Sequence, residues 1–463
     1  MMNNTGTQTM GSTRGTALYR TVWRWHFYAG LFCIPFVLML ALSGSIYLFK
    51  PQIDAWIDRP YHNLSVGAER ASPNEHIAAA LQAVPGSHFV NYQLPESPNH
   101  TVVIGVSQGG EQTLVYVNPY TREVLKTIGY EDQFIRQVRS FHGELLAGNA
   151  GSILVELAGC WAIVLIISGL YLWWPRSGQG IAGILYPRLT RGGRVFWRDL
   201  HAVTGIWISF FALFLLISGL PWALVWGSAF QEVRQWQAPT QQLSQQQSQH
   251  EGHHQAHQEQ DWSLGRAEEQ AALENAAVKE VSLLPTLLAN AQALNFAPPA
   301  LLSVSKDDST VWRLSSEHQN RTLRADAWLD DNGAVLRQQT FAEGKAVDRI
   351  IGIGAAAHEG QLFGWFNQLL GLLTTSGLIL ISITGFVLWR RRKPGRVLGA
   401  PPALPNERVG IAVTLIVFGL ALMLPLLAVS LLSLLTLEYF VLRRFRASRL
   451  WLGLEQAINP RFQ

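Results

Sequence analysis

The fold is decided by the stretch Arg194–Trp207, RVFWRDLHAVTGIW, in which a basic segment turns into a long apolar run. His201 stands at the start of that run, and Gly205 follows one helical turn later. An ionisable side chain at the mouth of an apolar helix is costly in a membrane and marks a candidate functional group. We therefore asked how many such runs the chain has and whether others begin in the same way.

The composition is that of a membrane protein. Of the 463 residues, 48% are hydrophobic and only 15% are charged, with 17 tryptophans. Four apolar runs are long enough to cross the roughly 30 Å hydrocarbon layer of a bilayer; they cover 27–49, 152–174, 202–226 and 362–389. A fifth run, 409–442, is too long for one span and contains Pro425, so it is either one kinked helix or a hairpin of two short helices.

Arginines indicate which side of the membrane each segment occupies. They gather before the first run, between the second and third, and after the fourth and fifth. By the positive-inside rule these segments are cytoplasmic, which favours the hairpin and predicts about six spans with both chain ends inside. The first run is longer than the apolar core of a usual signal peptide, so we expect an uncleaved anchor. The predicted division is 1–25 cytoplasmic, 26–50 span, 51–141 periplasmic, 142–174 span with an outer segment, 175–198 cytoplasmic, 199–226 span, 227–357 periplasmic, 358–390 span with an outer segment, 391–408 cytoplasmic, 409–442 hairpin and 443–463 cytoplasmic tail.

Charge and cysteine content exclude several classes of protein. The net charge of +4 comes from the loop arginines, and no nucleic-acid-binding motif accompanies it. Cys33 and Cys160 both lie within apolar runs, so neither a disulfide framework nor a thiolate metal cluster is expected. Any cofactor must then be held by other ligands.

An internal repeat links the spans. His26 is followed by glycine at +4 and by Ser-Gly at +17 and +18, and His201 is followed by the same residues at the same spacings: Gly30, Ser43 and Gly44 in the first case, Gly205, Ser218 and Gly219 in the second. His142 and His358 each precede a glycine by 27 residues and a tryptophan by 31. The chain is therefore a tandem duplication, about 26–176 and 201–391, in which each copy is a span, an outer segment and a span.

The two outer segments carry matching patterns. Each has a helical stretch, NEHIAAALQAV or VSLLPTLLANAQAL, followed by alternating apolar runs and a turn at Asn-Pro-Tyr-Thr or Asp-Asp-Asn-Gly. We predict two small α+β periplasmic domains. The second contains a Gln/His-rich insertion, 237–260, whose histidines are weak candidates for a metal site, a solvated polar insertion being the alternative; they are His250, His253, His254 and His257.

The four repeated histidines suggest a haem chemistry. The topology puts His26 and His201 at the inner ends of their spans, and His142 and His358 at or beyond the outer ends. Imidazoles from two helices at equal depth can supply both axial ligands of a haem iron. Two such pairs would carry electrons across the membrane, although a single histidine at a span end is more often an ordinary interfacial residue.

Glycines and arginines near these histidines complete the candidate set. Gly30 and Gly205 would let a flat porphyrin approach the backbone, and Gly44 and Gly219, five turns from the histidines, would leave a gap beside an outer haem. Haem propionates need cationic partners, for which the neighbouring arginines are candidates: Arg24 and Arg198 at the inner pair, and Arg136, Arg139 and Arg349 at the outer pair.

The motifs resemble a known family. The segments FHGELLAG, SGLYLWWPR, HEGQLFGWFNQLLG and TGFVLWRRR, with YVNPYTREVL and AWLDDNGAVL in the outer segments, are similar to PepSY-associated transmembrane proteins over about 18–445. The resemblance implies inner-membrane ferric-siderophore reductases with two haems b, and His26, His142, His201 and His358 match the haem-ligand positions. The Gln/His-rich insertion is not part of the family pattern.

The sequence thus predicts an integral inner-membrane haem oxidoreductase that reduces a ferric siderophore or another Fe(III) chelate. The short inner loops carry no nucleotide-binding glycine fingerprint, so the electron donor would be a cytoplasmic flavin or NAD(P)H reductase, or a quinol. Two alternatives remain at this stage. The outer domains could be a membrane-anchored binding module without catalysis, or the repeats could form a transporter, although Glu156 is the main acidic residue within the spans.

Overall fold

The structure is a computed structural model that describes residues 8–175, 181–236, 282–305, 308, 310–393, 395, 397–401 and 411–453. It divides into two compact units, which are described separately below. The helical unit comprises Met1–Ser45, His142–Trp236 and Leu372–Gln463, and the sheet unit comprises Ile46–Phe141 and Gln237–Gly371. The Gln/His-rich insertion 237–260, with its four candidate histidines, lies outside the described residues.

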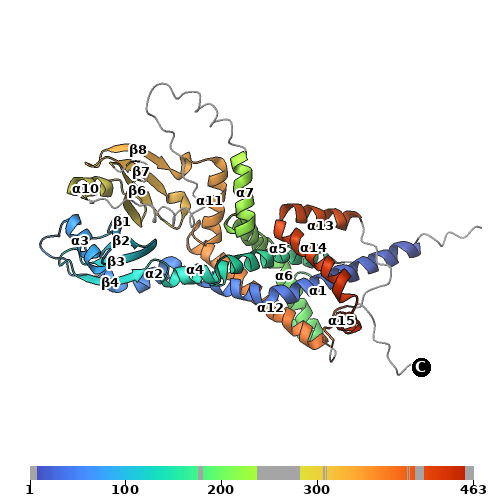
Figure 1. Ribbon diagram of the computed structural model, residues 1–463. Helices are drawn as coiled ribbons and strands as arrows, with labels where there is room; N and C mark the ends of the chain where they lie inside the picture. The colour runs from blue at the N-terminus through green and yellow to red at the C-terminus, as the bar shows by residue number, and fades with distance from the viewer. Residues whose placement is uncertain are drawn as a thin grey trace, which may run out of the picture. The chain divides into compact units, whose positions relative to one another are not determined.

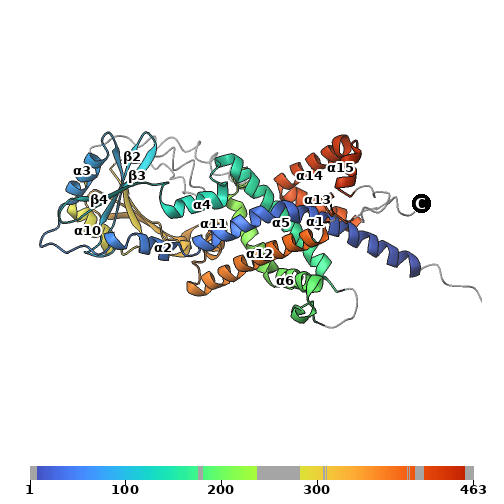
Figure 2. The same cartoon turned by 90° about the horizontal axis from the view of Figure 1, so that it is seen from below.

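The helical unit is built from long apolar helices. Its helices are α1 (Gln8–Tyr47), α5 (Gly148–Trp173), α6 (Gly193–Gly219), α7 (Leu224–Trp236), α12 (Trp365–Arg392), α13 (Ile411–Met423), α14 (Pro425–Leu437) and α15 (Arg446–Trp451). Three short helical segments accompany them: η2 (Leu189–Arg191), η3 (Leu220–Trp222) and η6 (Glu438–Leu442). Helices α1, α5, α6 and α12 cross in one bundle (Figures 1 and 2). Among the residues that the structure describes, five helices are long and apolar enough to cross a membrane: Ala17–Tyr47, Gly148–Trp173, Gly193–Trp222, Trp365–Arg392 and Pro425–Leu442.

The last apolar run breaks at Leu424, which has φ −127° and ψ 90° and is followed by Pro425. Proline cannot donate a backbone hydrogen bond, so the helix breaks at Pro425, the residue that the sequence analysis noted in this run. Helix α13 has 13 residues, about 20 Å at 1.5 Å per residue, which is too short to cross the hydrocarbon layer. The described residues therefore contain five candidate spans and one shorter apolar helix, where the charge pattern predicted about six spans.

The sheet unit holds one continuous antiparallel sheet. Its strands are β1 (His88–Gln93), β2 (Val102–Gln108), β3 (Glu111–Val117), β4 (Val124–Gly129), β5 (Ala300–Val304), β6 (Trp312–Ser316), β7 (Ala325–Leu329) and β8 (Val335–Thr340). Its helices are α2 (Lys50–Ile57), α3 (Pro73–Ala83), α4 (Phe134–Glu144, which ends in the helical unit), α10 (Pro285–Ala293) and α11 (Ala346–His358), with short turns η1 (Arg59–Tyr61), η4 (Arg321–Leu323) and η5 (Phe341–Glu343).

The strand order is β4-β3-β2-β1-β5-β6-β7-β8, so each outer segment contributes one half of the sheet (Figure 1). The halves join where β1 pairs antiparallel with β5, through Tyr92 opposite Leu302 and Gln93 opposite Leu301. Each half has the predicted order of a helix followed by antiparallel strands. The sequence pattern did not identify β1 or β5, the two strands that join the halves.

One hydrophobic core serves both halves of the sheet. Ile77 of α3 and Leu287 of α10 are buried in the same cluster as Tyr92, Leu302 and residues of the neighbouring strands. Helix α3 begins with a capping box, in which the Ser72 side chain accepts from the Glu75 backbone N–H. The shared core makes the two outer segments parts of a single α+β region.

Candidate cofactor-binding histidines

His26 is held by α5. Its Nδ1 lies 2.9 Å from the Ser168 hydroxyl, and that hydroxyl donates its own hydrogen to the Leu165 carbonyl at 3.2 Å. Because the serine hydrogen is already used, the hydroxyl oxygen accepts from Nδ1–H of the histidine. A Cβ at Gly169, the next residue, would lie 3.2 Å from Cε1 of His26, so the glycine makes room for the ring edge.

His142, near the end of α4, is held by α1 in the same manner. Its Nδ1 lies 2.9 Å from the Ser43 hydroxyl, which donates to the Met39 carbonyl at 2.8 Å. The serine oxygen therefore accepts from the histidine, as at His26. A Cβ at Gly44 would lie 3.2 Å from Cε1 of His142. The contact at Gly44 is thus with an imidazole, whereas the sequence had assigned that glycine to a porphyrin edge.

His201 repeats the arrangement on α12. Its Nδ1 lies 3.0 Å from the Thr384 hydroxyl and 3.1 Å from the Ile381 carbonyl. A carbonyl oxygen can only accept, so Nδ1 of His201 carries a hydrogen. A Cβ at Gly385 would lie 3.4 Å from Cε1 of the ring. A hydroxyl residue followed by glycine holds this histidine too.

These contacts favour one tautomer of the imidazoles. The Ile381 carbonyl can only accept, so Nδ1 of His201 carries a hydrogen, and a hydrogen on Nδ1 would likewise suit the Ser168 and Ser43 oxygens beside His26 and His142. The Nε2 nitrogen of each ring then carries the lone pair that a metal ion requires. A hydrogen bond from the other ring nitrogen is the usual way in which proteins orient a metal-binding histidine.

His26 and His201 belong to the helical unit, whereas His358 belongs to the sheet unit. His26 and His201 lie within electrostatic range of each other inside the helical unit. His358 is the last residue of α11 and belongs to the sheet unit. A fourth pair of a hydroxyl residue followed by glycine, Ser218 and Gly219, lies at the end of α6.

The glycines one turn after the inner histidines differ in their surroundings. A Cβ at Gly205 would meet no atom within 4 Å, and one at Gly30 would make an ordinary contact of 3.8 Å with the side chain of Leu165. Neither glycine is required by packing against the described side chains. Their small size is therefore compatible with a flat group lying against the helix, which is the role that the sequence suggested.

The candidate arginines at the inner pair already have partners. Arg24 is buried, and its Nη1 donates to the carbonyls of Pro401 at 2.9 Å and Gly453 at 3.1 Å. Arg198 donates from Nη2 to the carboxylate of Asp199 at 2.8 Å and is otherwise exposed. Arg24 thus links α1 to distant parts of the chain, and Arg198 forms an ion pair with its neighbour in α6.

The acidic residue of α5 has structural partners. Glu156 of α5 is buried, and its carboxylate accepts from the backbone N–H groups of Val225 at 2.8 Å and Trp226 at 3.1 Å. These N–H groups belong to the first turn of α7, where helical backbone lacks internal acceptors. Glu156 therefore caps α7, which weakens the argument for an ion-coupling carboxylate.

The described residues contain no group of three or more His, Cys, Asp or Glu side chains arranged to hold a metal ion. Cys33 and Cys160 are both buried, and Cys33 donates from Sγ to the Ala158 carbonyl at 3.7 Å.

Sequence reasoning missed Ser168 and Thr384, which hold two of these histidines. A signal was present, since a serine or threonine directly precedes a glycine in all four repeated spans: Ser43, Ser168, Ser218 and Thr384. The sequence interpretation used Ser43 and Ser218 to define the repeat but assigned a role to the glycines alone.

The five candidate spans and the sheet define a multi-pass membrane protein with an α+β region. The chain belongs to the PepSY-associated TM region family, whose pattern matches residues 23–392. The matched range contains all four repeated histidines and both halves of the sheet. A comparison with curated proteins gave no match.

Proposed function

We propose that this membrane protein is a haem b oxidoreductase of the bacterial inner membrane, which takes electrons at the cytoplasmic face and reduces an Fe(III) siderophore or similar ferric chelate on the periplasmic side. The observation that carries the proposal is the shared contact of His26, His142 and His201, each with Nδ1 against a hydroxyl oxygen of a residue that is followed by glycine. Family membership and the resemblance of the motifs support the reductase assignment.

The residues fit a haem better than a structural metal ion. Paired neutral imidazoles are a common axial ligand set for haem iron, whereas structural zinc takes four protein ligands that often include thiolates. We assign one haem to His26 and His201 and a second to His142 and His358, the latter pairing resting on the sequence repeat alone. Bound haem would supply reversible one-electron transfer at its iron.

The chain's own residues orient the ligands. Ser168, Ser43 and Thr384 keep the hydrogen on Nδ1 and direct each Nε2 lone pair away from the helix that holds the ring. Such a hydrogen bond also raises the basicity of the imidazole and so strengthens the bond from Nε2 to a metal. Glycine beside each ring edge lets the imidazole pack close to the neighbouring helix.

The overall reaction requires one electron for each iron. The electron comes from a reduced flavoprotein or a quinol, and Fe(III) in the chelate becomes Fe(II). Hard-oxygen chelators hold Fe(II) less firmly than Fe(III), so the reduction releases the iron. Proton transfer is not needed at the iron itself.

The proposal is tested with the full chain purified in detergent after expression with adequate haem. A dithionite-reduced minus oxidised spectrum should be that of a b-type haem, and adding a ferric siderophore to the reduced protein should reoxidise it and yield trapped Fe(II). His201→Ala should diminish both signals. The matched control is His62→Ala, which alters a histidine stacked on His100 in the sheet unit. Absence of a haem spectrum in the wild-type protein would exclude the proposal.

A further inference from the structure

Four arginines gather in the sheet unit around the end of α1 and the end of α11. Tyr47 lies within electrostatic range of Arg136, Arg139 and Arg321, and Arg321 within range of Arg324 and Arg139. Glu359, the residue after His358, is within range of both Tyr47 and Arg321. We call Arg136, Arg139, Arg321 and Arg324 the arginine cluster.

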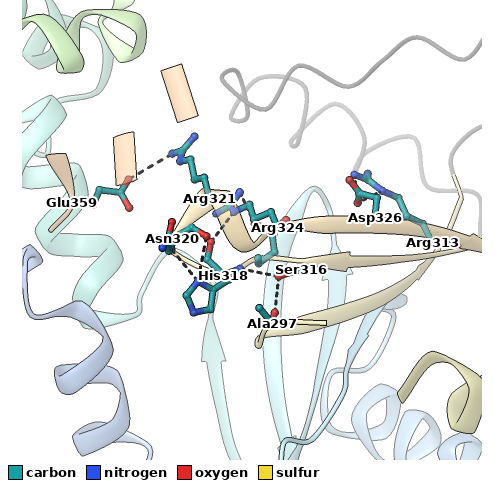
Figure 3. Close-up of polar contacts among 10 residues, drawn as sticks. Ala297, Arg313, Ser316, His318, Asn320, Arg321, Arg324, Asp326 and Glu359 are labelled. Carbon is teal, nitrogen blue, oxygen red and sulfur yellow. Dashed lines mark hydrogen bonds and ion pairs between the residues drawn. The ribbon is translucent and has the colours of Figure 1, made fainter. Parts of the chain in front are cut away.

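The segment that carries Arg321 and Arg324 is fixed by its own polar contacts. The Asn320 side chain accepts from the Thr322 backbone N–H at 3.2 Å and from its hydroxyl at 2.8 Å. His318 accepts at Nδ1 from the Asn320 backbone N–H at 3.0 Å, and its carbonyl accepts from Arg324 Nε at 2.8 Å (Figure 3). The backbone of this turn and the Arg324 guanidinium are therefore held in place by the fold.

Nearby carboxylates neutralise the cluster only in part. Arg321 is 13% exposed and its Nη2 lies 3.5 Å from the Glu359 carboxylate, which is 20% exposed (Figure 3). Arg324 pairs at 3.3 Å with Glu317, which is 45% exposed, and ion pairs with such a solvated partner contribute little.

Arg136 and Arg139 add positive charge from α4. Arg136 pairs at 3.2 Å with Glu131, which is 57% exposed and so neutralises it weakly. Arg139 makes neither a hydrogen bond nor an ion pair with any residue that the structure describes. Arg139 therefore gives the cluster a positive charge in excess of those paired with Glu131, Glu317 and Glu359.

Burial makes this excess costly. Loss of solvent lowers the pKa of Arg321, and the like charges of Arg324 and Arg139 lower it further, while Glu359 opposes them. Both polar atoms of the Gln319 amide, two residues before Arg321, are buried and have no hydrogen-bond partner among the described residues. A bound anion would offset the positive charge, and its oxygens could accept from Nε2 of the Gln319 amide.

We propose that the arginine cluster binds the carboxylates of a ligand beside α4 and the C-terminal end of α11. Arginine forks match carboxylate geometry, and Arg139 lies one turn before His142 on the same helix. The carboxylates have two sources: a propionate of a haem, which rests on the proposed function, or an acidic ferric chelate. The two sources share one chemistry and are separated by the experiment.

The first arm measures binding of citrate, a tricarboxylate, to the full-length protein by calorimetry. Arg139→Gln removes a charge without breaking a contact, and Arg321→Gln removes the buried one, with Arg321→Lys as the variant that keeps the charge. Arg337→Gln, an exposed arginine of β8 outside the cluster, is the control. If the chelate is the ligand, citrate binds the wild type and Arg139→Gln weakens it about tenfold, the loss of one charge-assisted contact.

The second arm measures haem affinity by titrating the haem-free protein. If a propionate is the ligand, Arg139→Gln binds haem about tenfold more weakly than Arg337→Gln does, and haem dimethyl ester, which lacks the free carboxylates, binds both variants equally. Unchanged citrate and haem affinities in Arg139→Gln and Arg321→Gln would overturn the inference. A wild type that binds no haem would contradict the proposed function instead, and citrate binding would then decide the inference alone.

Discussion

The Ser168 hydroxyl holds Nδ1 of His26 at 2.9 Å, and the adjacent Gly169 leaves room for the edge of the same ring. One pair of small residues therefore sets both the rotation of the imidazole and its distance from α5. The same pair, as Ser43–Gly44 and Thr384–Gly385, serves His142 and His201. Repetition of this contact on three helices indicates a common requirement of the histidines for a defined orientation.

Removing the hydroxyl at Ser168 should weaken cofactor binding. Ser168→Ala leaves Nδ1–H of His26 without its acceptor, and loss of such a supporting bond typically reduces metal affinity about 10- to 100-fold. The measurement is haem titration of the haem-free protein. Ser433→Ala on α14 is the control, because Ser433 donates to its own helix at Val429 and contacts no histidine. Equal haem affinities in the two variants would show that Ser168 does not support haem binding at His26.

Gly205→Ala separates packing from cofactor contact. An alanine here meets no side chain within 4 Å, and replacing a glycine inside a helix should stabilise the haem-free protein by about 0.5–1 kcal/mol. If a porphyrin lies against this turn, the same change lowers the haem bound per chain. Gly159→Ala, whose Cβ would lie 3.8 Å from Leu216, is the matched control and should keep its haem. Full haem content in Gly205→Ala would contradict a porphyrin contact at that turn.

Glu156 should matter for α7 and not for redox chemistry. Glu156→Gln keeps one acceptor oxygen for the Val225 and Trp226 N–H groups but loses the negative charge at the helix start, which should cost about 1 kcal/mol. Hydrogen exchange should quicken at the first turn of α7, with the haem spectrum unchanged. Unaltered exchange combined with lost ion-dependent uptake in proteoliposomes would favour the transporter alternative.

The sheet unit should lose stability in acid through His76. Burial lowers the pKa of this imidazole, whose Nε2 donates to the Pro119 carbonyl at 3.1 Å while Nδ1 lies 3.1 Å from the Tyr92 hydroxyl. The unfolded chain, with a histidine pKa of about 6.5, then binds the proton first. Stability contributed by neutral His76 is therefore complete above that pH and falls as the pH decreases toward the folded-state pKa.

The check is hydrogen exchange of β1 and β3 between pH 7.5 and pH 5 in the wild type and in His76→Phe, which cannot titrate. We expect the acid-induced increase in exchange to be smaller in the variant. An identical pH response in both proteins would show that other groups control the acid stability of the sheet.

Much of the architecture could be predicted because it depends on patterns of residues close together in the sequence. Hydropathy gave four long spans, and the spacing from His26 to Gly44 and from His201 to Gly219 gave the duplication. The turn residues were also readable: Asn118 and Asp330 accept backbone N–H groups within their own turns. Such features depend on residues close in the sequence.

The remainder depends on contacts between distant residues. Tyr92 pairs with Leu302 across the middle of the sheet, and no periodicity within β1 or β5 reveals that partner. Arg321 is charged and follows a polar segment, so its burial beside Glu359 is invisible until the chain folds. The hydroxyl–glycine pairs were visible as a pattern, but their meaning required knowing which helix faces which histidine.

The central claim is that His26 and His201 hold the same haem. The most direct measurement is haem per chain by the pyridine haemochrome assay in the wild type, His26→Ala, His201→Ala and the double variant. The account predicts about two haems in the wild type and about one in each single variant. The double variant should also keep about one, because the second substitution removes a ligand from an iron already lost. A further loss in the double variant, or full haem content in either single variant, would contradict the account.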